Sequence, residues 1–212
     1  ADKAGKHWFN IDRGYFKPGH YDGYYRISYK GTQQTIGLDK LDPDYDRWDN
    51  LGIYLTKLRN IDVSKTAIIC PPTEYVMSYF DAINEDEWIE KAILDVKSIG
   101  FERYKVRTKE MSLKEAESID FNNCGLSYTF NCSLGWKWLA RGIPVVSDPT
   151  HSIAGAYQKL VDKMLCQDYD ERRKLFAIMA SLQLTLAEIR EGYILPLIQK
   201  LISTSGMTKE KK

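Results

Sequence analysis

The sequence predicts an α/β fold built on a parallel sheet, and two observations carry that prediction. Between residues 66 and 152, short apolar runs that suit buried strands alternate with helical apolar spacing. Within this region, Gly125–Ser152 has the pattern strand, polar turn, short helix, glycine stop, strand and polar turn. Crossovers between parallel strands are right-handed. We therefore expect polar residues at the strand ends to share one edge of the sheet, where doubly wound sheets bind ligands.

Each element of this alternation has its own signal. Thr66–Cys70 is a continuous apolar run stopped by two prolines, which predicts a strand buried on both faces. Glu85–Ser98 carries an apolar stripe typical of an amphipathic helix. Tyr104–Arg107 follows a glycine stop and predicts the next strand, and Leu113–Ser118 predicts a short helix.

The Gly125–Ser152 unit supplies the next strand, helix and strand. Leu126–Thr129 is rich in β-forming residues, and Asn131 and Ser133 are residue types that cap helix N-termini. Gly142 is placed to end the helix. The valines at 145 and 146 then resume a buried, extended run.

The N-terminal part lacks this regularity. His7–Asp12 predicts a short strand, and the Tyr- and Gly-rich segment 15–35 predicts an ordered surface of paired short strands, either an acceptor face or an aromatic-rich loop. The acidic segment Leu41–Asn50 predicts a solvated linker or hinge. It fails the calcium-loop pattern because Arg47 and Ile53 stand where Gly and Glu are required, and we expect no metal.

The C-terminal part predicts helices at 153–165 and 171–182. A last helix begins after Thr185 as its cap, with Pro196 kinking it or starting a new segment. We divide the chain into residues 1–50, a remnant of an acceptor-side subdomain and linker, residues 51–202, the sheet domain with C-terminal helices, and a flexible tail at 203–212. The start has no initiator Met, which predicts that a preceding strand and helix belong to a longer chain.

Composition bounds the function. A formal net charge of +1 in 212 residues gives no global field for nucleic acid or membrane. No apolar run reaches the roughly 20 residues of a membrane span. We expect a soluble, cytoplasmic protein. Its cysteines have no metal-type spacing and predict free thiols; they are Cys70, Cys124, Cys132 and Cys166.

Polar residues at four strand ends predict a site for a nucleoside diphosphate. Arg107 and Lys109 offer cations for phosphate, and a helix N-terminus at Ser133 offers free N–H groups. Further side chains suited to orienting ribose or sugar are Thr73, Thr129, Asn131, Ser133 and Ser152. The structural alternatives are solvated charges, helix caps and, for His151, an ordinary surface residue.

The segment Asn131–Pro149 resembles the Asn/Ser-Ser-x-x-x-x-x-Ala-Leu-x-x-Gly-Ile-Pro-Val-Val pattern of the nucleotide-sugar domain of GT-B-type glycosyltransferases, closest to small bacteriophage-type enzymes and capsular polysaccharide synthesis proteins. Trp136 and Trp138 depart from the small or aliphatic residues of that pattern. Further matching segments lie at Trp8–Phe16, Ile68–Pro72, Val106–Lys109 and Leu184–Gly192.

This resemblance implies a Rossmann-like sheet that holds a nucleotide sugar through Arg107, Lys109, Asn131, Ser133 and the loop Asp148–Ser152, which includes His151. It also implies a sugar transfer to a hydroxyl acceptor, either a hydroxymethylated DNA base or a surface glycan. We expect Asp12, with His20 in reserve, to act as the base from the acceptor side. The alternative is a non-catalytic binding subunit, which would act with a partner subunit.

Overall fold

The computed structural model describes residues 6–57, 59–79, 84–108, 121–162 and 168–205. By their contacts the residues fall into two units. The first unit comprises 1–54, 149–162 and 170–212, and the second comprises 55–148 and 163–169. The sequence predicted that the C-terminal helices belong with the parallel sheet. The structure instead groups them with the N-terminal segment.

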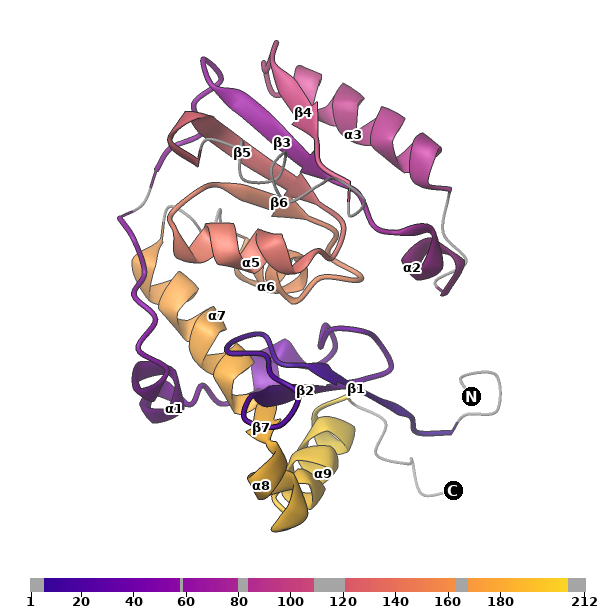
Figure 1. The fold of residues 1–212 in the computed structure, drawn as a ribbon, viewed down its shortest axis with the longest axis vertical. Helices are drawn as coiled ribbons and strands as arrows, with labels where there is room; N and C mark the ends of the chain where they lie inside the picture. The colour runs from indigo at the N-terminus through magenta and orange to yellow at the C-terminus, as the bar shows by residue number, and fades with distance from the viewer. Residues whose placement is uncertain (1–5, 58, 80–83, 109–120, 163–167, 206–212) are drawn as a thin grey trace. The chain divides into compact units, whose positions relative to one another are not determined.

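The second unit is built on a four-stranded parallel sheet (Figure 1). Its strands are β3 (Thr66–Cys70), β4 (Tyr104–Val106), β5 (Cys124–Thr129) and β6 (Val145–Ser147), in the order β4-β3-β5-β6. All three pairings are parallel. The predicted α/β class with a parallel sheet is therefore confirmed. Its strands lie within a residue or two of the predicted runs.

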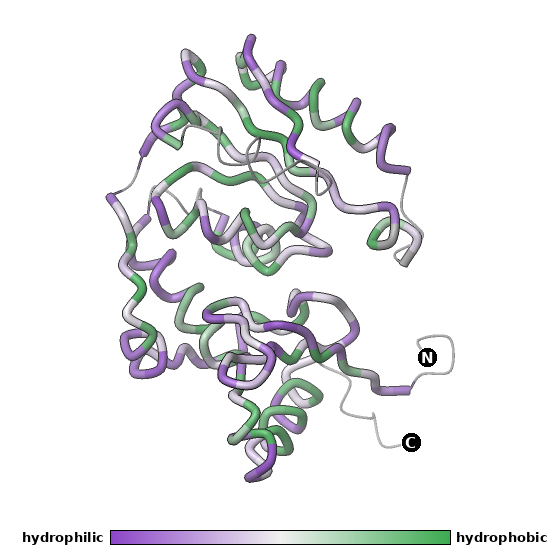
Figure 2. The backbone as a smooth tube through the Cα atoms, in the orientation of Figure 1, coloured by the Kyte–Doolittle hydropathy of each residue, from purple (hydrophilic) through white to green (hydrophobic). Residues whose placement is uncertain are grey.

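Helix α3 (Glu85–Ser98) covers one face of this sheet. Asn84 caps its N-terminus by accepting a hydrogen bond from Glu87 N at 2.9 Å. Hydrophobic and hydrophilic residues recur along the helix once per turn (Figure 2), and the buried residues Trp88, Ala92 and Val96 form the apolar stripe that the sequence predicted. Its apolar stripe joins alternate strand residues in one core cluster, which contains Ala67, Ile69, Trp88, Ala92, Val96, Phe101, Leu126 and Phe130. The short helix α2 (Glu74–Tyr79) follows β3.

Helix α5 (Ser133–Ala140) packs on the opposite face of the sheet (Figure 1). A Cβ on Gly135 would lie 2.8 Å from the Thr129 methyl carbon, so a glycine lets helix and strand approach closely. Trp136 and Trp138, which depart from the glycosyltransferase pattern, are both buried. Trp138 meets Phe121, in the short 3-10 helix η3 (Phe121–Asn123), edge-on at 5.6 Å. The two tryptophans that depart from the pattern therefore pack in the core of the second unit.

The first unit has its own sheet, which is antiparallel. Strand β1 (Phe9–Arg13) pairs with β2 (Tyr24–Tyr29), and β2 pairs with β7 (Gln183–Thr185). The two N-terminal strands agree with the predicted short strands. The sequence did not predict β7, because three residues with no alternation carry no strand signal and only the distant partner β2 makes them one.

Aromatic side chains form the core of the first unit. Trp48 stacks on Phe176 with ring centroids 5.1 Å apart, and Phe16 lies 5.2 Å from Trp48. Tyr15 and Tyr29 are also buried. Two expectations were therefore wrong in part: Tyr15 and Tyr29 of the Tyr-rich segment are core, although Tyr21 is 87% exposed, and the acidic segment forms helix α1 (Tyr45–Asn50) in place of a solvated linker. Aromatic rings replace the aliphatic residues on which the prediction depended.

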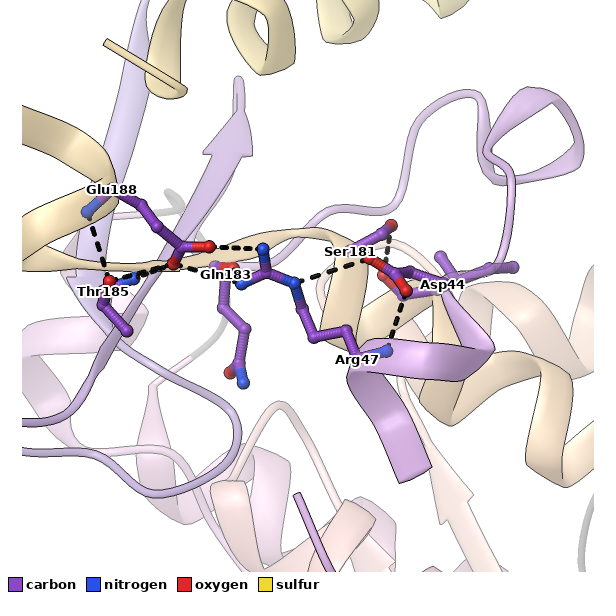
Figure 3. Close-up of polar contacts among 7 residues, drawn as sticks. Asp44, Arg47, Ser181, Gln183, Thr185 and Glu188 are labelled. Carbon is purple, nitrogen blue, oxygen red and sulfur yellow. Dashed lines mark hydrogen bonds and ion pairs between the residues drawn. The ribbon is translucent and has the colours of Figure 1, made fainter. Parts of the chain in front are cut away.

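An ion pair joins α1 to the C-terminal part of the first unit (Figure 3). Arg47 donates to Glu188 at 2.5 Å and to the backbone oxygen of Gln183 at 3.0 Å. Glu188 also closes a capping box with Thr185, the predicted cap of helix α8 (Leu186–Arg190). Asp44 caps α1 by accepting from Arg47 N at 2.8 Å. The Glu188 carboxylate thus caps α8 and also anchors α1 through Arg47.

The remaining helices lie almost entirely in the first unit; they are η2 (Leu38–Lys40), α6 (Ile153–Val161), α7 (Tyr169–Ser181) and α9 (Ile194–Thr204). Pro196 lies in the first turn of α9, so it begins a new helix as one of the two predicted options. The predicted helix at 113–118 and most of the predicted tail lie outside the described residues. None of the described helices has the length and apolarity to cross a membrane.

We predict that Glu188→Gln lowers the free energy of unfolding by about 1–3 kcal/mol at neutral pH, because Arg47 loses its charged partner. Burial raises the pKa of Glu188, but the hydrogen bonds from Arg47 and Thr185 outweigh it and hold the pKa below 4.5. Stability from this lowered pKa is present above 4.5 and lost as the pH falls through the folded value. The variant should therefore lose less stability in acid than the wild type.

Urea unfolding of both proteins between pH 3 and pH 7, at about one-unit steps, measures this difference. Glu191→Gln is the control, because Glu191 is an exposed carboxylate in the same helical region. Equal pH profiles for the Glu188 variant and the wild type would contradict the assignment.

A second prediction concerns Gly142, which ends α5 with a φ of 70°. Its carbonyl oxygen accepts from Arg59 N at 3.0 Å, and a Cβ at this position would collide with the carbonyl oxygen of Lys57. Gly142→Ala should cost about 1–3 kcal/mol. At Gly52, φ is 64° and no atom of the described residues lies within 4 Å of the place that a Cβ would take, so Gly52→Ala isolates the backbone strain. We expect Gly142→Ala to lose more unfolding free energy than Gly52→Ala. Equal losses in the two variants would contradict a cost from the collision with Lys57.

Candidate functional site

The second unit reverses its winding between β3 and β5. From β3 the chain proceeds to β4 on one side, whereas β5 pairs with the other side of β3 and leads on to β6. Open α/β sheets bind ligands at such a reversal, outside the carboxyl ends of the strands. We call the residues that directly follow β3, β4, β5 and β6 the carboxyl edge. The candidate site lies there, between β3 and β5.

The turn after β5 leads directly into α5 at this edge. Thr129 Oγ1 accepts a hydrogen bond from Cys132 N at 3.1 Å, and Gly135 N donates to Cys132 O at 3.0 Å. Cys132 is therefore the N-cap, a position that the sequence assigned to Asn131 or Ser133. Ser133 is exposed as the first helical residue, and Asn131 is half-buried. Gly135 N is used by Cys132 O, and the Leu134 N–H stabilises the Cys132 thiolate, so α5 offers the Ser133 N–H and its positive dipole end at the edge.

Arg107 brings a cation to the same edge. It directly follows β4, and its backbone N donates to Ile69 O at 2.7 Å, which extends the pairing with β3 by one residue. Its positive charge acts to lower the pKa of two thiols. They belong to Cys70, which ends β3, and to Cys132, which precedes α5. Lys109, the second predicted cation, lies outside the described residues.

The other predicted members of the edge have mixed roles. The Thr73 carbonyl accepts from Val76 N at 2.9 Å and begins α2, and its side chain is half-buried. Asp148 N donates to Phe130 O at 3.2 Å, which places Asp148 beside the turn after β5. Thr129, predicted to orient ribose or sugar, is 1% exposed and uses its hydroxyl in the turn. The structure therefore shows Thr129 in a structural role, as the acceptor that holds the turn before α5.

His151 and Ser152 belong to the first unit and not to the unit that carries the sheet. Ser152 is buried as the N-cap residue of α6, and the next residue, Ile153, donates its N–H to Gln33 Oε1 at 3.0 Å. The predicted site residues that the second unit brings to one edge are Thr73, Arg107, Thr129, Asn131, Ser133 and Asp148.

The two predicted catalytic residues lie close together on the first unit. Asp12 pairs with Arg26 at 2.5 Å and accepts from Arg13 N at 2.7 Å. The guanidinium of Arg13 lies 2.9 Å from His20 Nε2, which accepts its hydrogen bond. Asp12 and His20 are thus linked through Arg13. A role for either of them as the base stays a prediction.

Sequence reasoning missed a pair of thiols at the carboxyl edge. Cys70 is the last residue of β3 and pairs in register with Thr129 of β5, whose turn positions Cys132. Each of the two thiols is the largest influence on the pKa of the other. The available signal was that each cysteine ends or follows one of two strands that are neighbours at the winding reversal. With Cys124 they are free thiols, as predicted, and Cys166 lies outside the described residues.

A surface hollow of about 290 Å³ on the second unit lies around the N-terminus of α3 and includes Glu74, the residue after Thr73. Its lining is Glu74, Asn84, Glu85, Asp86, Glu87 and Glu90. Five carboxylates repel a diphosphate, so this hollow is a poor candidate for nucleotide binding. Among the described residues no three His, Cys, Asp or Glu side chains gather in a way that could hold a metal ion.

Comparison of the chain with protein-family models and with curated proteins gave no match. The geometry of the carboxyl edge and the motif resemblance are therefore the two indications of function.

Proposed function

We propose that this protein is a nucleotide-sugar-dependent glycosyltransferase whose donor lies at the carboxyl edge between β3 and β5. The observation that carries the proposal is the strand order β4-β3-β5-β6. This order brings the N-terminus of α5 and the residue after β4 to the two sides of one winding reversal. The motif at Asn131–Pro149, which resembles the donor segment of GT-B-type enzymes, spans α5 and β6 in this arrangement.

The chemistry of the edge suits a diphosphate. The Ser133 N–H at the start of α5 donates to a phosphate oxygen, and the helix dipole favours the negative charge of the phosphates. Arg107 adds a guanidinium that binds phosphate in a bidentate manner. The exposed Ser133 hydroxyl and the Asn131 amide supply further polar groups for the ribose or the sugar. Lys109, two residues after Arg107, adds a second cation in this proposal.

Sugar transfer by such a site depends mainly on positioning and on charge. Negative charge grows on the diphosphate as the bond to the sugar breaks, and the same donors stabilise it as it develops. The acceptor hydroxyl must also lose its proton to a base within hydrogen-bond reach. We assign this role to Asp12, with His20 as the reserve. The acceptor is a hydroxymethylated DNA base or a surface glycan.

One observation favours a second candidate, a glycosyltransferase-like binding subunit without catalysis. Asp12 already pairs with Arg26, whose side chain is 13% exposed and whose guanidinium lies 5.3 Å from the Tyr15 ring centroid. A carboxylate engaged in this way has a structural role that explains its presence. Donor hydrolysis distinguishes the two candidates, because the enzyme releases free sugar slowly to water whereas the binding subunit only binds.

We predict that Arg107→Ala weakens binding of a nucleoside diphosphate about tenfold or more, because one charge-assisted contact to phosphate is lost. Isothermal calorimetry with the uridine, guanosine and adenosine diphosphates measures the dissociation constants. Arg103→Ala is the matched control, since it removes the same charge from an exposed residue just before β4, at the amino end of the sheet.

The control should bind like the wild type. Equal affinities for wild type, Arg107→Ala and Arg103→Ala would place the nucleotide elsewhere. If no diphosphate and no sugar derivative of one bound the wild type, the donor site would be contradicted.

A diphosphate that binds only the folded protein should also stabilise it. At one hundred times its dissociation constant, the ligand should raise the free energy of unfolding by about 2.7 kcal/mol.

A further inference from the structure

The thiols of Cys70 and Cys132 form a contacting pair at the carboxyl edge. Cys70 ends the buried strand β3 and is itself 1% exposed. Cys132 is half-buried, and the backbone bond from Cys132 N to Thr129 Oγ1 holds it in the turn after β5. Because Cys70 is in register with Thr129 and the Thr129 hydroxyl holds Cys132 N, the two cysteines are neighbours, and each thiol is the largest influence on the pKa of the other. Two thiols on different elements thus meet through the parallel pairing of β3 with β5.

The surroundings of Cys132 stabilise a thiolate. The Cys70 thiol and the backbone N–H of Leu134 both donate to its sulfur, and the charges of Arg107 and Lys137 add to the effect. The pKa of Cys132 is accordingly lowered, while the pKa of Cys70 is raised by its hydrogen bond to Cys132 and by burial. The thiolate is the nucleophilic form of cysteine.

Cys124 shows the contrasting behaviour within the same sheet. Its S–H donates to Leu126 O at 3.4 Å, and burial raises its pKa to about 11. It is 1% exposed at the start of β5, at the opposite edge. A buried thiol of this kind is inert. The reactive environment is therefore local to the carboxyl edge.

We propose that Cys132 and Cys70 are a reactive dithiol, in which hydrogen peroxide oxidises Cys132 and Cys70 then closes a disulfide. In the first step the Cys132 thiolate attacks one peroxide oxygen, the O–O bond breaks, and a sulfenic acid and hydroxide form. In the second step the Cys70 sulfur attacks the sulfenic sulfur, the S–O bond breaks, and water leaves. In total, two thiols give two electrons and two protons to one hydrogen peroxide, and the products are one disulfide and two water molecules.

This inference does not rest on the proposed glycosyltransferase function, because it depends only on the contacts of the two sulfurs. The product would join the end of β3 to the N-terminus of α5 across the winding reversal. A thiol modification site would therefore lie directly at the carboxyl edge.

The test treats the reduced full-length chain with about one equivalent of hydrogen peroxide at neutral pH. Free thiols are then blocked, and the protein is digested without reductant. Chymotrypsin cleaves after Tyr128 and Phe130 and so separates Cys124 from Cys132. We expect a peptide pair bridged through Cys70 and Cys132, about 2 Da lighter than the two thiols and lost on treatment with dithiothreitol.

Two substitutions resolve the order of the steps. In Cys70→Ser the sulfenic acid has no partner, so dimedone should label Cys132. In Cys132→Ser neither the bridge nor the label should form, whereas Cys124→Ser should behave like the wild type. Iodoacetamide should also alkylate Cys132 in the wild type at least about ten times faster than Cys124.

Three results would overturn the proposal. They are no bridged peptide in the wild type, a bridge that uses Cys124 or Cys166 instead, and dimedone label on Cys70 in Cys132→Ser. The mapping of the unaltered chain decides the first two outcomes even where a variant fails to fold.

Discussion

The parallel pairing of β3 with β5 is the constraint on which the second unit and its candidate site depend. It places the end of β3 beside the turn after β5, with Cys70 opposite Thr129 in register. That turn uses the Thr129 hydroxyl to hold Cys132 N, and α5 begins at the next residue. The position of the helix N-terminus and of the two thiols follows from this pairing, whereas Arg107 is placed by the pairing of β4 with β3. A shift of register would separate them.

The first unit depends on a different contact, between Arg47 and Glu188. Residues 141 positions apart meet there, so α1 is held to β7 and α8 by charge while Trp48 packs on Phe176 beneath. The carboxylate is also required by the Thr185 capping box. Local capping and long-range pairing therefore share one side chain. This sharing explains why an acidic, Pro-containing segment folds as a docked helix and not as a hinge.

The sequence was informative where one short segment settles its own structure. Apolar runs and the amphipathic stripe located β3, α3 and the unit from β5 to β6, and Thr185 was identified as a cap. Sequence reasoning failed where distant residues decide the outcome: β7 is a strand only beside β2, and Phe16 in the Tyr-rich segment is core because rings from α1 and α7 pack against it. At the site, residue types indicated the edge, but the roles of Thr129 and Cys132 depend on turn geometry that spacing does not reveal.

We propose that a nucleoside diphosphate binds at the carboxyl edge between β3 and β5. The most direct measurement is a titration of the isotopically labelled protein with uridine, guanosine and adenosine diphosphate, followed through its backbone amide resonances. We expect one of these ligands to shift the amides of Thr73 and of residues 131–135 first and most strongly. Amide shifts confined to the acidic hollow around α3 or to the first unit, or no shifts with any of the three, would contradict it.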